Sequence, residues 1–172
     1  VFLFSAWCYT LWLRIVQVQV RRYLLAISAL MVLWILLRSI KFSIGNTDAE
    51  RRLWYFYYFP MLFIPMLSVF VSQSLGKDEA FRLPRWTKLL YIPTLLLLLL
   101  VLTNDLHRQV FSFPSGVLSD GEYRYEKGYY FVLGWEALCA AFSLVLMVRS
   151  CRIPHSRSIR WLPLVPFALS LA

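Results

Sequence analysis

The fold is decided by residues 53–75, whose sequence is LWYFYYFPMLFIPMLSVFVSQSL. No side chain in this stretch carries a formal charge, and Pro60 and Pro65 are its only prolines. A helix that crosses the hydrocarbon core of a bilayer needs about 20 mainly apolar residues. The stretch therefore predicts a membrane-spanning helix. Each proline predicts a kink, because it removes one backbone hydrogen bond from the helix.

Further apolar runs lie on both sides of this one, and charged residues bound them. The six runs are residues 1–13, 23–37, 53–75, 89–103, 129–148 and 161–172. The second and fourth are short and must borrow neighbours such as Ser39, Ile40, Trp86 and Thr87. The first and last read as truncated. We therefore expect an all-α, polytopic transmembrane helix bundle that forms one membrane domain over residues 1–172 of a longer protein.

The overall composition agrees with a membrane protein. Apolar residues make up 60% of the 172 residues and charged residues only 16%, with a mean hydropathy of +0.62. These values exclude a disordered chain and make an ordinary soluble domain a poor fit. The net charge of +9 is compatible with basic flanks of membrane spans, and no nucleic-acid-binding motif accompanies it.

The distribution of Lys and Arg predicts the orientation. The odd-numbered loops hold eleven basic residues, which are Arg14, Arg21, Arg22, Lys77, Arg82, Arg85, Lys88, Arg149, Arg152, Arg157 and Arg160. The even-numbered loops hold seven, which are Arg38, Lys41, Arg51, Arg52, Arg108, Arg124 and Lys127. Cytoplasmic loops carry the excess of basic residues. We therefore expect cytoplasmic odd-numbered loops and an N-terminus outside a plasma membrane.

The densest polar cluster is the turn from Thr103 to Gln109, at the predicted outer end of the fourth span. On a helix, Asn104 and His107 share one face, and Asp105 and Arg108 share the next. Such a turn could bind a small polar ligand or cap the helix and anchor a loop. His107 could also sense external pH. One His and one Asp fall short of a zinc signature, so no metal site is predicted.

Glu136 is the one acid well inside a predicted span, about 10 Å along the helix from its outer end. A carboxylate there must face protein, water or a partner. It could fix helix packing through a hydrogen bond, or it could take part in a ligand- or proton-linked step. Gly134, Ala137 and Ala141 would let another helix approach nearby.

Aromatic residues and a long loop also mark the predicted outer side. Trp54 and Tyr58 begin the third span, where they could anchor the helix at the interface or line a ligand cleft. Residues 105–128 contain the turn signals Pro114-Ser115-Gly116 and Ser119-Asp120-Gly121, which predict a small hairpin or lid. The ligand or sensing candidates are therefore Asn104, Asp105, His107, Arg108, Glu136, Trp54 and Tyr58.

The ordered pattern resembles a known family, the seven-helix N-terminal sensor region of bacterial histidine kinases. The stretches that carry the resemblance are Trp54 to Tyr58 with Pro60, Phe63 and Pro65; Leu102-Thr103-Asn104-Asp105-Leu106-His107 with Val110-Phe111; Gly128-Tyr129-Tyr130 with Trp135; and Arg149 to Pro154. The resemblance extends over nearly the whole chain. It implies an outside N-terminus, seven helices and a cytoplasmic signalling module in the same chain.

The chain has no catalytic motif and no sign of a cofactor. Neither His107 nor His155 lies where a phosphoacceptor could, and the seventh helix is missing. We expect the input domain of a receptor whose partners are the lipid bilayer, an extracellular or membrane-borne stimulus and the output module, and which could form a homodimer. The alternatives are a small-molecule transporter or permease fragment, a sensor with a DNA-binding output, and a purely structural membrane subunit.

Overall fold

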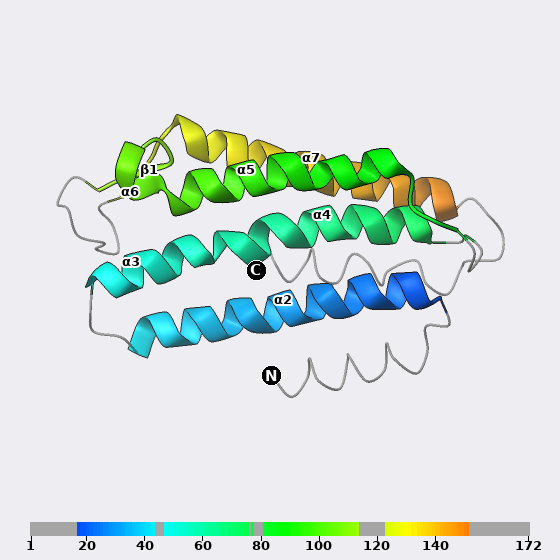
Figure 1. Cartoon of the computed structure of the whole chain (residues 1–172), viewed down its shortest axis with the longest axis horizontal. Helices are drawn as coiled ribbons and strands as arrows, with labels where there is room; N and C mark the ends of the chain where they lie inside the picture. The colour runs from blue at the N-terminus through cyan, green and yellow to red at the C-terminus, as the bar shows by residue number, and fades with distance from the viewer. Residues whose placement is uncertain (1–16, 44–46, 76, 78–80, 114–122, 152–172) are drawn as a thin grey trace.

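The computed structural model describes residues 17–43, 47–75, 77, 81–113 and 123–151. Figure 1 shows long helices that run side by side along one direction. The elements are α2 (Val18–Ser43), α3 (Thr47–Phe56), α4 (Tyr58–Ser74), the 3₁₀ helix η1 (Arg85–Leu90), α5 (Tyr91–Leu102), α6 (Asn104–His107), β1 (Phe111–Ser112), β2 (Arg124–Tyr125) and α7 (Lys127–Cys151). The all-α bundle predicted from the sequence is confirmed. The runs 1–13 and 161–172 lie outside the described residues.

Four helical segments of the described chain are long and apolar enough to cross a membrane. They are Val18–Lys41, Asp48–Ser74, Arg85–Leu102 and Lys127–Ser150. Each corresponds to one predicted run but is longer than that run. The helices continue into the flanking basic residues because long Lys and Arg side chains can lie along a helix while their charges reach water.

The third span is interrupted at Tyr57, between α3 and α4. The amide of Tyr57 donates to the carbonyl of Trp54, which is a tighter turn than an α-helix makes. Pro60 explains the interruption, because it has no N–H to offer the carbonyl of Phe56 and its ring would collide with that carbonyl. Pro65 instead lies inside the continuous helix α4.

The fourth span begins as a 3₁₀ helix and becomes α-helical at Tyr91. Pro93 is then in the first turn of α5, where its missing N–H does not break the helix. Thr87 of η1 is buried and donates a hydrogen bond of 2.9 Å to the side-chain oxygen of Gln73 on α4. This bond ties the start of the span to its neighbour.

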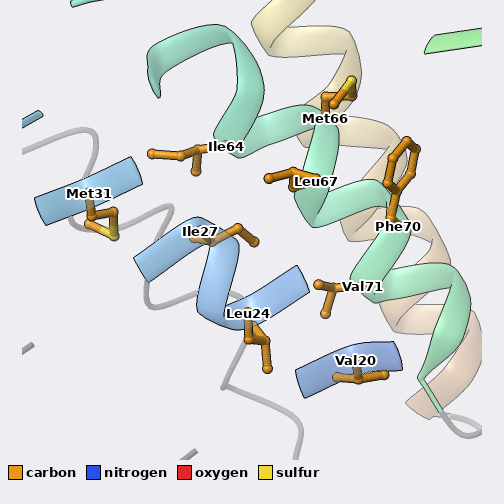
Figure 2. Packing of buried hydrophobic residues seen from close by; sticks show 9 residues of the cluster. All are labelled: Val20, Leu24, Ile27, Met31, Ile64, Met66, Leu67, Phe70 and Val71. Carbon is orange, nitrogen blue, oxygen red and sulfur yellow. The ribbon is translucent and has the colours of Figure 1, made fainter. Parts of the chain in front are cut away.

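Helix α4 is the centre of the bundle and packs against α2, α5 and α7. Of the most apolar 18 residues of its span, 72% are buried, whereas the corresponding share is 22% in each of the other three spans. The α2–α4 seam is apolar, as Figure 2 shows. It is formed by Val20, Leu24, Ile27 and Met31 of α2 with Ile64, Met66, Leu67, Phe70 and Val71 of α4.

The outer faces of α5 and α7 expose large apolar side chains. These include Ile92, Leu95, Leu96 and Leu99 on α5, and Phe131, Leu138, Leu144, Val145 and Val148 on α7. A water-soluble protein rarely exposes so much contiguous apolar surface. The faces therefore suit contact with lipid.

Strands β1 and β2 pair antiparallel, with Phe111 opposite Tyr125 and Ser112 opposite Arg124. The small hairpin predicted in the loop from residue 105 to residue 128 is therefore present. The turn signals between the strands, in residues 114–122, lie outside the described residues.

Candidate functional site

The polar turn predicted as a site lies at the end of the bundle where α2 and α5 end and α3 and α7 begin (Figure 1). We call this the clasp end. Helix α6 follows α5 here, and the chain then turns through Arg108 and Gln109 into β1. The turn thus lies between three spans and the hairpin.

Asn104 is completely buried and uses its whole side-chain amide. Its Oδ1 accepts hydrogen bonds from the backbone amides of Val110 and Phe111, both at 3.0 Å. Its Nδ2 donates to the carbonyl of Phe111 at 2.9 Å and to the hydroxyl of Tyr55 at 3.1 Å. One side chain therefore holds α6, the strand entry and α3 together. We call Asn104 with these partners, Asp105 and His107 the Asn104 clasp.

Asp105 extends the clasp to a second residue of α3. Its Oδ1 accepts a 2.7 Å hydrogen bond from the Tyr55 hydroxyl and lies 3.3 Å from Nε of Arg51. Arg51 also pairs with Asp48 one turn earlier, with Nη2 at 3.1 Å from Oδ1. Asp105 is thus oriented by α3, although the Asp105 side chain stays 41% exposed.

His107 folds back onto the last turn of α5. Its Nε2 lies 3.1 Å from the carbonyl oxygen of Leu100, and its Nδ1 accepts a 3.0 Å hydrogen bond from the amide of Gln109. A carbonyl oxygen can only accept, so this network assigns the proton to Nε2 and leaves Nδ1 as the acceptor. Both ring nitrogens of the neutral imidazole are therefore used within the protein.

Arg108 ends α6 in the left-handed conformation, with φ of 50° and ψ of 31°. Its amide donates a 2.7 Å hydrogen bond to the carbonyl of Asn104, which closes the turn. A left-handed residue directly after a helix is a common C-terminal cap, although glycine adopts it more easily. The side chain of Arg108 is exposed.

An aromatic cluster covers the clasp, and the fully buried ring of Phe111 is its centre. The ring centroid of Trp54 lies 4.4 Å from that of Phe111, and the centroids of Tyr58 and Tyr129 lie at 5.4 and 5.9 Å. Trp54 and Tyr58, the two aromatic candidates from the sequence, thus pack against the strand that Asn104 positions.

The hairpin extends the same cluster. Tyr125 of β2 stacks on Tyr129 with centroids 4.0 Å apart. A hydrogen bond with Tyr123, together with burial, raises the pKa of Tyr125 above the usual value for a tyrosine. Tyr125 therefore stays a neutral phenol at physiological pH.

Helix α7 joins the clasp through Gly128. Its amide donates a 2.8 Å hydrogen bond to the carbonyl of Gln109, and a Cβ at this position would lie only 2.8 Å from the same oxygen. Two more bonds support the joint: the amide of Glu126 donates to the carbonyl of Val110, and the Ser112 hydroxyl donates to the Glu126 carboxylate. Glycine is needed here for close approach of two backbones.

Glu136 lies apart from the clasp, in the α4–α7 seam. The Ser72 and Ser143 hydroxyls are 2.6 Å apart across this seam. Both helices run in the same direction, away from the clasp end. Glu136 lies as many residues before Ser143 as Pro65 lies before Ser72, so Glu136 is level with Pro65. The Glu136 carboxylate interacts electrostatically with Tyr58 and Tyr129. Its Oε1 is buried, and none of the described residues forms a hydrogen bond with it.

A family model described as the N-terminal 7TM region of histidine kinase matches residues 1–170. The chain belongs to this family. This membership and the four membrane-type helices make the chain a multi-pass membrane protein of the histidine-kinase sensor type. No curated protein and no solved structure matches it.

The candidate residues of this histidine-kinase region thus fall into two groups. Asn104, Asp105 and His107 are joined in the clasp, Arg108 closes its turn, and Trp54 and Tyr58 pack on it. Glu136 lies apart from this group on α7, within electrostatic range of Tyr58 and Tyr129. Asp105 pairs with Arg51 and not with Arg108, the residue that shares its predicted helix face.

One expectation about helix contacts differs in the structure. Gly134, Ala137 and Ala141 lie on the exposed side of α7, so they do not make the contact with α4. The buried face of α7 is formed by Val132, Cys139, Ser143 and Met147, and on this face Ser143 forms hydrogen bonds with Ser72 and Ser68 of α4. Arg51, Tyr55 and Gly128 were not singled out as site residues, because their roles depend on contacts with segments distant in the sequence.

Proposed function

We propose that this domain receives a stimulus at the clasp end and relays it to a cytoplasmic output module in the same chain. The clasp end faces the outside of the cytoplasmic membrane, as the loop charges favour. The observation that carries the proposal is the hydrogen bonding of Asn104, which couples the ends of separate spans through one side chain. A stimulus that changes the hydrogen bonds of Asn104 would therefore move the ends of all the spans that it couples.

The candidate residues have different roles in this proposal. Asn104 and His107 position the turn, since internal partners already occupy their polar atoms. Asp105 and Arg108 are exposed and would meet the stimulus. Trp54 and Tyr58 would pass a movement of Phe111 along the third span, towards Glu136.

A stimulus can shift the helices only by its different affinity for two arrangements of the bundle. In the arrangement described here the clasp is closed. A ligand that competes for Asp105 or wedges beside Arg108 would favour an arrangement in which α5 and α7 separate from α3. The resulting displacement at the far ends of the spans is the signal that the output module would read.

The test is phosphorylation by the full-length protein in membrane vesicles. We expect Asn104→Asp, which keeps the side-chain size but loses the two donated hydrogen bonds, to change basal phosphorylation several-fold. Leu106→Ala is the matched control, because Leu106 lies in the same turn but is 87% exposed. If Asn104→Asp inserts normally and its output matches that of Leu106→Ala, the clasp does not relay the signal.

A further inference from the structure

A second polar group lies at the clasp end, on the opposite side of α3 and α4. It consists of Trp34 and Arg38, one turn apart on α2, and Tyr57 at the α3–α4 interruption. Figure 2 shows that α2 and α4 run antiparallel, with Val20 beside Val71 and Ile27 near Ile64. Continuing this register brings Tyr57 level with the turn from Trp34 to Arg38. We call these three side chains the Trp34 patch.

Two of the three present buried hydrogen-bond donors that have no partner among the described residues. Trp34 Nε1 and the Tyr57 hydroxyl are both buried, and no described residue forms a hydrogen bond with either. The Tyr57 side chain is nearly enclosed, since the residue is only 9% exposed. A buried polar group without a hydrogen bond costs free energy, so we expect these two donors to form hydrogen bonds with a bound ligand.

The third member supplies a positive charge. The Arg38 guanidinium carbon lies 5.7 Å from the Trp34 ring centroid, and its charge also acts on Tyr57. Arg38 is exposed, and no carboxylate of the described residues forms an ion pair with it. The nearby Arg51, by contrast, already pairs with Asp48 and Asp105.

The chemistry of these groups defines the ligand. The indole N–H can only donate, a phenol can donate, and a guanidinium offers several donors and a charge but no acceptor. We propose that the Trp34 patch binds an anionic oxygen ligand of the phosphate type. Arg38 would contact the charged oxygens, and Trp34 and Tyr57 would each donate one hydrogen bond to them.

The depth of the patch favours the phosphate of a membrane lipid over free phosphate. Arg38 lies five residues before the end of α2 at Ser43, which is about 7.5 Å along the helix. The headgroup layer of a bilayer has a thickness of this order, about 5 to 7 Å on each side. With the end of α2 at the water side of this layer, the backbone of Arg38 lies at the inner edge of the layer, and its long side chain can reach outward to a lipid phosphate. This site does not depend on the proposed relay through the clasp.

The test measures the unfolding temperature of the full chain in a phosphate-free maltoside detergent. Three probes are compared: dihexanoyl phosphatidylglycerol, dihexanoylglycerol with the same acyl chains but no phosphate, and inorganic phosphate. We expect phosphatidylglycerol to raise the unfolding temperature with saturation, and dihexanoylglycerol to leave it unchanged. Ligands that bind only the folded state act in this way.

The variants are Arg38→Gln, Trp34→Phe and Tyr57→Phe. Each is expected to weaken the apparent affinity for phosphatidylglycerol about tenfold or more, as loss of a hydrogen bond to a charged group does. Arg52→Gln, Trp86→Phe and Tyr130→Phe are the matched controls, since these exposed residues lie outside the patch. Without any anion, Tyr57→Phe should unfold at no lower temperature than the unchanged protein, because its hydroxyl has no partner to lose.

The outcomes are distinct. Stabilisation by phosphatidylglycerol alone supports a lipid site, and equal stabilisation by inorganic phosphate supports an anion site filled from solution, provided that the three variants weaken it. The proposal is overturned if no phosphate-bearing probe stabilises the chain. It is also overturned if the patch variants respond like the controls.

Discussion

The Asn104 clasp and the α4–α7 seam both place polar side chains inside the bundle, but they differ in how those side chains are satisfied. In the clasp, the amide of Asn104 has partners for both its oxygen and its nitrogen. In the seam, Glu136 has a buried oxygen with no hydrogen-bond partner in the part of the chain that the structure describes. A satisfied network fixes one geometry, whereas an unpaired acceptor leaves a position that another arrangement of the helices could satisfy.

The difference has a local cause. Asn104 follows a helix end, where backbone amides are free to bond with a side chain. Glu136 is in mid-helix, level with Pro65 on α4, where the backbone of its own helix is already hydrogen-bonded. Only a side chain could serve it, and among the described residues neither Tyr58 of the facing helix nor Tyr129 of its own helix donates a hydrogen bond to that oxygen.

The largest effect is expected from breaking the clasp. Asn104→Ala should lower the free energy of unfolding by about 3 kcal/mol, because it leaves the buried amides of Val110 and Phe111 and the Phe111 carbonyl without partners. Unfolding in mixed micelles measures it. Asn104→Asp should cost less, since the acceptor oxygen is kept. Equal losses for both variants would mean that the donated bonds alone matter.

Separating α7 from the clasp should have the next largest effect. Gly128→Ala should lower the free energy of unfolding by about 2 kcal/mol, because the new Cβ would be forced against the backbone oxygen of Gln109. The matched control is Gly134→Ala on the same helix, where the added carbon would meet no described atom within 4 Å beyond its chain neighbours and the nearby backbone of its own helix. That change should stabilise the helix by about 0.5 to 1 kcal/mol. The same sign for both variants would contradict the close approach at Gly128.

Glu136 in the seam is expected to respond in the opposite direction from the clasp. Glu136→Gln should raise the free energy of unfolding by about 1 kcal/mol, because a neutral amide is cheaper than a carboxylate inside a membrane. Ser143→Ala is the comparison, since it removes hydrogen bonds to Ser72 and to the Ser68 carbonyl. It should lower the same quantity by about 0.6 kcal/mol. A destabilising Glu136→Gln would show that Glu136 has a partner in the membrane.

The smallest effect is expected at the end of α6. Arg108→Gly should raise the free energy of unfolding by about 0.5 kcal/mol, because glycine adopts the left-handed conformation without steric cost. Arg108→Val should lower it, since a β-branched residue resists this conformation. Thermal unfolding of the two variants side by side measures the difference. The difference between the two variants separates the effect of backbone strain on the stability of the clasp from the effect of its hydrogen bonds.

Much of the fold was predictable from the order of the residues. Charge-free stretches such as 53–75 predict spans because only a helix satisfies its own backbone inside lipid. The exact ends were less predictable: α2 begins at Val18 and includes Arg21 and Arg22, which the charge pattern assigns to a loop. Side chains long enough to reach water make such charges compatible with a helix.

The sequence alone determined that the chain is a helical membrane domain and that its polar residues gather in the turn from Asn104 to Arg108. Local rules suffice for this, because apolar length and the positions of charges need no knowledge of neighbours. Only the tertiary structure decided that Asn104 bonds to Tyr55 and β1, that Gly128 touches Gln109, and that Oε1 of Glu136 stays unpaired. The bonds of Asn104 to Tyr55 and of Gly128 to Gln109 join segments that are distant in the sequence, so only the packing of the helices brings them together.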